Sequence, residues 1–524
     1  MKEFKLPYHK SHINFSIAEE RVNGVLVSHS EDYKPTMSES DLVQYALDNP
    51  IDSPKLSELV VGKKHIVVIS SDHTRPVPSH ITMPLILKEI RKANNDCRIT
   101  ILIATGMHRP TTYQELVDKY AQKIVDEEEI IIHDAYKDED MTFLGILPSG
   151  GELWVNKLVA ECDLLISEGF IEPHFFAGFS GGRKSVLPGI ASKKTVLWNH
   201  NSKFISSPFS RAGSIDENPI HRDMLFAAKQ AKLTFILNVV INGEKKVINA
   251  FAGNLETAHQ KGREFLASLA QVKPVISDIA ITTNGGYPLD QNMYQTVKGL
   301  TAGEACVKEG GVIIIASSCC DGDGGEFFYS ILKNAKTPQE AWDNIVKVDP
   351  SETVFDQWEA QVLARILIKA NVIVVRAFAE RISLFRTEEY HVSHSETYLV
   401  LVALFVAPAS TVKAQSFIMS VKVVGIALEV NAIKAFFAHD LTKSALVINT
   451  RHNLSVNFLD VGYLREIYPN RLFIFLDKIR LHAVFLAIHR EFYELLTTVI
   501  CKFCKFISGF NPFGESVIVC IKLK

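Results

Sequence analysis

The sequence lacks the features that mark membrane, secreted and nucleic-acid-binding proteins. No apolar run approaches the ~18 residues of a membrane-spanning helix. The longest candidate, residues 398–407, meets Pro408 and is better interpreted as buried core. The N-terminus has no apolar signal-peptide core. The eight cysteines are scattered, which fits a reducing cytosol better than a disulfide framework. The net charge of −3 gives no electrostatic reason to expect nucleic acid. We therefore expect a cytoplasmic protein without a membrane span or a nucleic-acid partner.

Glycine becomes scarce toward the C-terminus. Only 4 of the 28 glycines lie in residues 376–524, where phenylalanine is dense and glycine-marked strand ends are rare. This segment could be a separate domain, or a divergent or out-of-frame replacement of an original C-terminus. The sequence alone does not decide its fold.

The first 375 residues alternate short apolar runs with helix-like segments. The apolar runs are rich in β-branched residues, and they lie at 65–71, 98–106, 163–169, 235–242, 278–286, 311–317 and 371–375. The helix-like segments include 83–93, 113–126 and 252–269. Near-continuous apolar strands that alternate with helices are typical of parallel sheets buried on both faces.

A chain of 524 residues is long enough for two or three domains. We place a boundary near residue 270, because Lys273-Pro274 has the character of a linker. The expected fold class is α/β, with two domains of mainly parallel sheets and an active-site cleft between them. Residues 1–270 would form the N-terminal catalytic domain and residues 271–375 the second α/β domain. Residues 376–524 would be an atypical C-terminal segment of unknown fold.

Two polar motifs directly follow predicted strands. Asp72, Thr74 and Arg75 lie in a turn after the first, and the planar guanidinium of Arg75 suits a carboxylate or a phosphate. His108 follows the second strand, just after Gly106, which allows close backbone approach. An imidazole with an unperturbed pKa of about 6.5 suits proton transfer near neutral pH. A structural Asp–Arg pair and a structural histidine are the alternatives.

The next motif holds a candidate base, a glycine-rich turn and a lysine. These are His174, then Gly178, Gly181 and Gly182, then Lys184. Backbone N–H groups of a glycine turn can bind one phosphate. A lysine held in a dry pocket can form covalent links. An exposed lysine at a helix start is the alternative.

The glycine-rich turn nearly matches a nucleotide-binding P-loop. Counted from Gly178, the pattern GxxxxGK[ST] requires glycine at position 183, where the chain has Arg183. A bulky residue there disfavours tight wrapping of a nucleoside triphosphate. A P-loop-like ATPase or kinase is therefore kept as an alternative function. An inactive binding protein, a consequence of the altered C-terminus, is another.

Further candidates lie beyond this turn. His200 could bind a metal through a neutral imidazole, but no CxxC or HExxH pair accompanies it. Its metal would need ligands from elsewhere, such as a cofactor. In the second domain, Tyr294, Gln295 and Lys298 fall within one turn of a predicted helix. Polar groups that follow strand ends in two domains indicate a small-ligand site between them.

With these motifs in place, the sequence resembles the nickel-pincer lactate racemase family, a group of 2-hydroxy-acid racemases and epimerases. The resemblance covers roughly residues 1–375, and its motifs appear in the same order. They are SDHTRPVP at 71–78, TGMHRP at 105–110, EPHFFAGFSGGRKSVLPG at 172–189, the region of His200, NMYQTVKG at 292–299 and FDQWEAQVLARIL at 355–367.

The resemblance implies a nickel cofactor, pyridinium-3,5-bisthiocarboxylic acid mononucleotide, whose two sulfur arms and ring carbon hold the metal. Lys184 matches the lysine joined to one arm, and His200 matches the fourth nickel ligand. A roughly square-planar arrangement is one that nickel(II) favours. Proteins that make and insert this cofactor are the implied partners. The implied cofactor-binding residues are Lys184, Asp72, Thr74, Arg75, Gly178, Gly181, Gly182, Gln295 and Lys298.

The resemblance also implies a racemase that interconverts D- and L-lactate, or a close 2-hydroxy acid. His108 and His174 would be the catalytic acid–base groups on opposite faces of the substrate carbon. One would take the hydroxyl proton while hydride moves to the cofactor, and the other would supply a proton when hydride returns to the opposite face. The implied substrate-binding residues are Arg75, Tyr294, Lys298 and Trp358.

Overall fold

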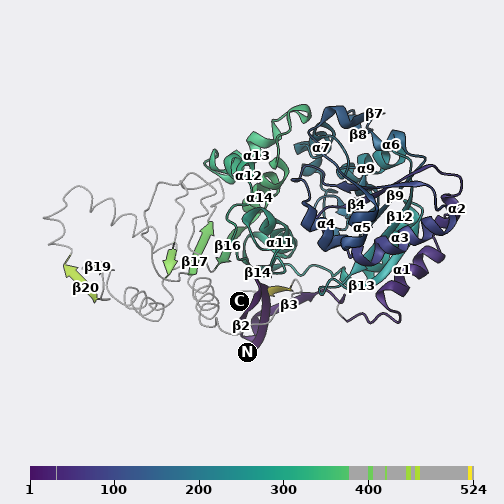
Figure 1. Cartoon of the computed structure of the whole chain (residues 1–524). Coiled ribbons are helices and arrows are strands. Elements are labelled where there is room, and N and C mark those ends of the chain that lie inside the picture. The colour runs from purple at the N-terminus through teal and green to yellow at the C-terminus, as the bar shows by residue number, and fades with distance from the viewer. Residues whose placement is uncertain are drawn as a thin grey trace.

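The computed structural model describes residues 1–30, 32–376, 399–404, 419–421, 444–449, 455–460 and 517–521. Two large sheets, each with its own helices, make up most of the described chain (Figure 1). The α/β fold class expected from the sequence is confirmed. The division into residues 1–270, 271–375 and 376–524 stays a prediction.

The first sheet has six strands in the order β13-β12-β9-β4-β5-β6. Every neighbouring pair is parallel except β12 with β13. In chain order the strands are β4 (His65–Ser71), β5 (Arg98–Ala104), β6 (Glu129–Ile132), β9 (Leu164–Phe170), β12 (Leu233–Ile241) and β13 (Val247–Gly253).

Helices cover both faces of this sheet. Along β4, Val67 and Ile69 belong to one hydrophobic cluster, whereas Ile66 and Val68 belong to another on the opposite face. This explains the continuous apolar run in the sequence, since both faces are buried. The helices are α1 (Glu39–Asp48), α2 (Leu56–Leu59), α3 (Ser79–Ala93), α4 (Tyr113–Tyr120), α5 (Gln122–Glu127), α6 (Leu158–Glu161), α7 (Lys193–Asn199), α8 (Ser202–Ser206), α9 (Pro219–Gln230) and α10 (Thr257–Ala270).

The second sheet has seven strands in the order β18-β17-β16-β15-β14-β21-β3. Only its central strands, β14 (Ser277–Thr283), β15 (Val307–Ala316) and β16 (Asn371–Arg376), pair in parallel. The antiparallel strands are β3 (Val22–Val27), β17 (Leu399–Leu404), β18 (Met419–Val421) and β21 (Val517–Ile521). Its helices are α11 (Met293–Cys306), α12 (Glu326–Lys333), α13 (Pro338–Val346) and α14 (Gln357–Lys369).

Several short elements complete the described chain. Two-stranded pairs are formed by β1 (Lys2–Tyr8) with β2 (Ser11–Ile17), β7 (Met141–Ile146) with β8 (Glu152–Asn156), β10 (Pro173–His174) with β11 (Gly178–Phe179), and β19 (Ser444–Asn449) with β20 (Ser455–Asp460). Single 3₁₀ turns are η1 (Glu19–Arg21), η2 (Asp138–Asp140), η3 (Gly182–Ser185) and η4 (Pro350–Glu352). In Figure 1, β2 lies beneath β14, near β3, the edge strand of the second sheet.

All seven predicted strands are present, with ends shifted by a few residues. Two of the helix predictions were partly wrong. The segment 113–126 is divided into α4 and α5, because Ala121 between them adopts a left-handed φ of 70°. The segment 252–269 begins too early, because Ala252 and Gly253 end β13, which pairs with β12. Tertiary pairing therefore overrides the local helical pattern at that point.

The apolar run 398–407 is only partly described. Its residues 399–404 form β17, and the rest lies outside the described residues. No helix in the described part of the chain is long and apolar enough to cross a membrane.

A buried carboxylate ties β9 to its neighbours below the site. Glu168 on β9 is 2% exposed and accepts hydrogen bonds from Ser70 on β4 and from Ser79 and Thr82 on α3. Tyr120 in turn donates its hydroxyl to Ser70. These bonds fix the end of β4 against β9 and α3, just before the chain reaches Asp72.

Candidate active site

The predicted site residues of the first domain gather where parallel strands end. Strands β4 and β5 run in register, with Ser71 opposite Ala104, and β9 lies on the other side of β4. The segments that follow these strands therefore leave the same edge of the sheet. This is the edge at which ligands of open α/β sheets bind.

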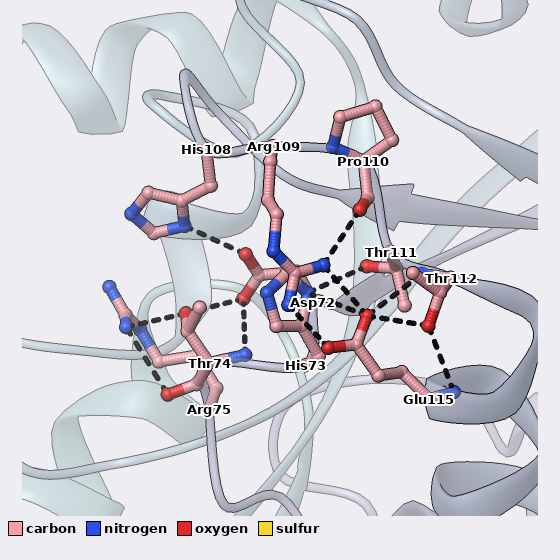
Figure 2. Close-up of polar contacts among 10 residues, drawn as sticks. All are labelled: Asp72, His73, Thr74, Arg75, His108, Arg109, Pro110, Thr111, Thr112 and Glu115. Atoms are coloured by element: carbon pink, nitrogen blue, oxygen red, sulfur yellow. Dashed lines mark hydrogen bonds and ion pairs between the residues drawn. The ribbon is translucent and has the colours of Figure 1, made fainter. Parts of the chain in front are cut away.

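His108 and Asp72 form a hydrogen-bonded pair at this edge (Figure 2). His108 Nδ1 lies 2.7 Å from Asp72 Oδ2, although the two residues are 36 positions apart. Asp72 is 1% exposed, whereas the His108 side chain is 44% exposed. A carboxylate can only accept here, so His108 carries its proton on Nδ1 in the neutral form. Its Nε2 is then left as the proton-accepting atom.

Opposing effects act on the Asp72 carboxyl. Burial alone would raise its pKa, but the hydrogen bond and charge of His108, together with Arg75 and Thr74, lower the pKa to about 2. Thr74 donates both its hydroxyl, at 2.7 Å, and its backbone N–H, at 3.2 Å, to Asp72 Oδ1. Asp72 is therefore an anion near neutral pH, and it holds His108 in one orientation and one tautomer.

This lowered pKa predicts a pH-dependent contribution to stability. The Asp72 carboxylate contributes fully above the unfolded pKa, near 3.8, and the contribution is lost as pH falls through about 2. We expect Asp72→Asn to lower the free energy of unfolding by about 2 kcal/mol at pH 6, a difference that shrinks between pH 4 and pH 2. Urea unfolding across this range measures it. Asp118→Asn, at an exposed aspartate, is the control, and an equal pH response in both variants would contradict the assignment.

A second set of polar contacts closes the turn around His108. Arg75 donates to the Thr74 hydroxyl at 2.9 Å, next to Asp72 (Figure 2). Arg109 makes two contacts with Glu115, at 2.9 and 2.5 Å, and so ties the loop after β5 to the first turn of α4. These bonds hold the loops that follow β4 and β5 in place. Arg75 lies beside the His108–Asp72 pair and is not part of that hydrogen bond.

His174 and Lys184 lie next to each other, as the sequence motif predicted for residues of one site. The Lys184 Nζ is 3.4 Å from His174 Nε2. The backbone N–H of Ala177 donates to His174 Nδ1 at 3.2 Å, so the neutral imidazole carries its proton on Nε2. In the neutral tautomers that these contacts select, Nε2 carries the proton in His174 and lacks it in His108.

The surroundings favour the uncharged form of both groups. Burial, followed by the charges of Lys184, Lys298 and Arg75, lowers the pKa of His174 well below its usual 6.5. Burial, followed by the charges of Arg183 and Arg75, lowers the pKa of Lys184 well below 10.5. A neutral amine is the nucleophilic form of lysine, so Lys184 is suited to covalent attachment.

His200 is a buried imidazole with one nitrogen unpaired. It lies at the C-terminal end of α7, is 5% exposed, and its Nδ1 donates to the Val196 carbonyl at 3.0 Å. Burial, followed by the charge of Lys184, lowers its pKa to about 3. Its Nε2 has no hydrogen-bond partner among the described residues and keeps its lone pair. A donor bond from one nitrogen to a backbone carbonyl is the usual support of a metal-binding histidine.

The glycine-rich turn owes its glycines to close packing. A Cβ on Gly178 would collide with the Ser214 carbonyl, and one on Gly181 would lie 2.8 Å from the Phe170 carbonyl. The backbone N–H of Gly182 donates to Asn238 Oδ1 at 2.8 Å, so the protein itself already pairs it. The phosphate-binding role expected for Gly178, Gly181 and Gly182 stays a prediction.

Residues of the second sheet's helices reach the same place. Lys298 on α11 donates to Gln295 Oε1 at 2.6 Å, and its Nζ lies 5.9 Å from the ring centre of Phe175. Trp358 on α14 donates to the Tyr294 hydroxyl at 3.2 Å, and the Trp358 ring lies 5.1 Å from that of His200. The structure thus places Trp358 against His200 and Lys298 near Phe175, while the roles predicted for these residues stay predictions.

Sequence reasoning missed several charged and aromatic residues of this region. Glu172 lies among the cations. Burial raises its pKa overall, against the opposing effects of Arg75, Lys298 and Lys184. Glu359 on α14 is 1% exposed, and burial raises its pKa to about 8, against the effect of Lys298. Phe176 packs edge-on against His200 at 5.2 Å. Glu172 and Phe176 lie inside the quoted motif around His174, which was the signal available to find them.

Comparison with known proteins agrees with this arrangement. The family model described as the lactate racemase N-terminal domain matches residues 8–213, and the lactate racemase C-terminal domain matches residues 272–419. The second match continues past residue 375, where the motif resemblance ended.

Two relatives are lactate racemases. That of Thermoanaerobacterium thermosaccharolyticum is 56% identical over 375 residues, and that of Lactiplantibacillus plantarum is 54% identical over 375 residues. Each alignment covers 72% of this chain and 88% of the relative. The solved apoprotein structure of the Thermoanaerobacterium enzyme superposes with a TM-score of 0.70 at 55% identity, again over 72% of this chain and 88% of that one. The chain therefore belongs to the lactate racemase family.

Proposed function

We propose that this protein is an isomerase that interconverts D- and L-lactate, or a close 2-hydroxy acid. The observation that carries the proposal is one shared site. Around Arg75 and Lys184 it groups two imidazoles whose neutral forms carry the proton on different ring nitrogens, a buried lysine amine with a lowered pKa, and a buried histidine with an unpaired nitrogen. The family membership and the identity of the two relatives support the same reaction.

The residues fit the lysine-tethered nickel pincer cofactor of the resemblance. Lys184 has the depressed pKa that covalent attachment needs, and His200 offers Nε2 as a metal ligand, with Nδ1 held by Val196. Among the described residues no group of three His, Cys, Asp or Glu side chains could hold a metal, so further donors would come from the cofactor. Lys184 and His200 would hold the cofactor, which would supply a reversible hydride acceptor for the substrate carbon.

His108 and His174 move the hydroxyl proton. His108 accepts it at Nε2, while Asp72 stabilises the imidazolium that forms. His174 serves the opposite face through its own Nε2. Arg75 and Lys298 bind the substrate carboxylate, with Tyr294 and Trp358 closing the pocket. The carboxylate would offset the positive charges of Arg75 and Lys298, which now lower the pKa of His174, and so bring that pKa toward the working range.

The position of the Arg183 side chain argues against the P-loop alternative. Its guanidinium folds into the loop and donates to the carbonyls of Ala177 and Phe179. A P-loop instead directs backbone N–H groups at phosphates. We therefore do not propose an ATPase or a kinase.

The proposal is tested by making the protein with and without the cofactor-synthesis and insertion proteins that we propose as its partners. We expect nickel and lactate isomer exchange only in the first preparation, measured by elemental analysis and by chiral chromatography of each enantiomer. Nickel-loaded, folded protein without exchange of any 2-hydroxy acid would overturn the proposal and favour a binding protein.

A further inference from the structure

Arg183 is a buried arginine without a carboxylate partner among the described residues. It is 1% exposed and, with Arg376, is one of the two largest fully buried side chains that the structure describes. Burial lowers its pKa to about 9, and the other charged group acting on it is a second cation, Arg263. A buried guanidinium must satisfy its donors in another way.

The two Nη atoms of Arg183 bind backbone carbonyls of the turn that precedes it, whereas its buried Nε has no hydrogen-bond partner among the described residues. Nη2 lies 2.7 Å from the Ala177 carbonyl oxygen, and Nη1 lies 2.8 Å from that of Phe179 and 3.4 Å from that of Gly181. One planar group thus holds three carbonyls within five residues. This multiple contact uses the rigid fork of arginine, which lysine does not have.

His259 on α10 binds the Ser180 carbonyl, which lies between those of Phe179 and Gly181 in the chain. Its Nε2 lies 2.8 Å from the Ser180 oxygen, and because a carbonyl only accepts, the proton is on Nε2. The same nitrogen lies 3.3 Å from Arg183 Nη1, so the two side chains are in contact. The ring also packs against Gly182, where a Cβ would lie 3.0 Å away.

The bound segment connects the two reactive groups of the site. His174 pairs with Gly178 in the β10–β11 ladder at one end, and Lys184 directly follows Arg183 at the other. The 3.4 Å separation between Lys184 Nζ and His174 Nε2 therefore depends on the path of the backbone between them.

We propose that Arg183, supported by His259, is a positioning residue: it fixes the backbone from Ala177 to Gly181 and so places Lys184 against His174. This inference rests on the proposed function, which gives Lys184 and His174 their roles in the reaction. Arg183 is also the residue that breaks the P-loop pattern in the sequence. A P-loop binds a phosphate through its backbone N–H groups, whereas Arg183 binds the backbone carbonyls of this turn.

Arg183→Lys is the main test, because it keeps the positive charge and loses the fork. Arg91→Lys is the matched control: Arg91 also binds two backbone carbonyls, of Asn95 and Cys97, but lies at the end of α3. His259→Leu is the second variant, which removes the donor to Ser180 and is judged by the same measurements if Arg183→Lys does not fold.

The first measurement uses the cofactor-free chain and needs no activity. Competitive acetylation by acetic anhydride, read by peptide mass spectrometry over a pH series, gives the midpoint for Lys184. We expect Arg183→Lys to raise the midpoint by about one pH unit or more, because a freed loop exposes the amine while the charge at 183 is retained. Arg91→Lys should leave it unchanged.

The second measurement uses the loaded enzyme. We expect Arg183→Lys to lower kcat for lactate about 100-fold, since misplacement by about 1 Å has effects of this size. KM should change far less, because Arg75 and Lys298 bind the carboxylate. Thermal unfolding, recorded for all variants, separates a loss of kcat caused by misplacement of Lys184 from one caused by general destabilisation.

The outcomes separate the two proposals. A folded Arg183→Lys with the wild-type acetylation midpoint and wild-type kcat overturns the positioning role, while racemisation by the wild type stands. Suppose that the midpoint shifts in Arg183→Lys but the loaded wild type racemises nothing. This result supports the positioning role of Arg183 and overturns the proposed function. If only His259→Leu folds, an unchanged midpoint in that variant overturns the role.

Discussion

Replacing either His108 or His174 by alanine should lower lactate racemisation by at least about 100-fold, and by up to about 10⁴-fold, in both directions. Each direction uses both imidazoles, one on each face of the carbon. The enantiomers have equal free energies, so kcat/KM must fall equally for D- and L-lactate in each variant. Chiral assays from both enantiomers measure this. His80→Ala, at an exposed imidazole of α3, is the control.

A single-turnover experiment on the same variants tests the opposite-face arrangement. Each loaded variant keeps one histidine, so acid quenching should release pyruvate from one enantiomer only, and the two variants should prefer opposite enantiomers. Pyruvate from the same enantiomer in both variants would contradict the two-face scheme. Retention of racemisation within about tenfold in either variant would contradict the acid–base role itself.

Replacing Lys184 should have an equally large effect through a different cause. We expect Lys184→Ala and Lys184→Arg, made together with the cofactor-synthesis proteins, to carry no covalent adduct and no racemase activity. Arginine keeps the charge but its guanidinium, always protonated in proteins, is not a nucleophile. Intact-mass and peptide mass spectrometry measure the adduct, and elemental analysis measures nickel.

The exposed Lys194, which pairs with Glu152 at 2.6 Å, provides the matched control. Lys194→Ala should keep both adduct and activity. Full racemase activity in wild-type protein whose Lys184 is unmodified would refute the tether. An adduct found on another lysine of Lys184→Ala would show that the amine is not selected by its depressed pKa.

Much of the first sheet could be predicted from the sequence. The runs that became β4 and β5 are mostly apolar and are buried along most of their length, because both faces of the sheet are covered, and each ends at a polar turn. The end of β13 could not be predicted in this way. Ala252 and Gly253 continue into a helical pattern, and only antiparallel pairing with β12 makes them a strand.

The second sheet depended on contacts between distant parts of the chain. Strand β21, near the C-terminus, pairs with β14 and with β3, near the N-terminus. Local pattern carries no information on such pairing, because the partners are hundreds of residues apart. Most of the C-terminal segment, residues 376–524, lies outside the described residues, so the prediction about its nature stays a prediction.

The amino-acid sequence by itself determined the chemistry available to this protein: the imidazoles His108, His174 and His200, the amine Lys184, and their position after strand ends. Only the tertiary structure decided how they are used. Strand register placed Asp72 against His108, and buried donors on Arg183 folded the glycine turn so that Lys184 meets His174. The physical reason is that protonation state depends on burial and neighbouring charge, and both are properties of the folded chain.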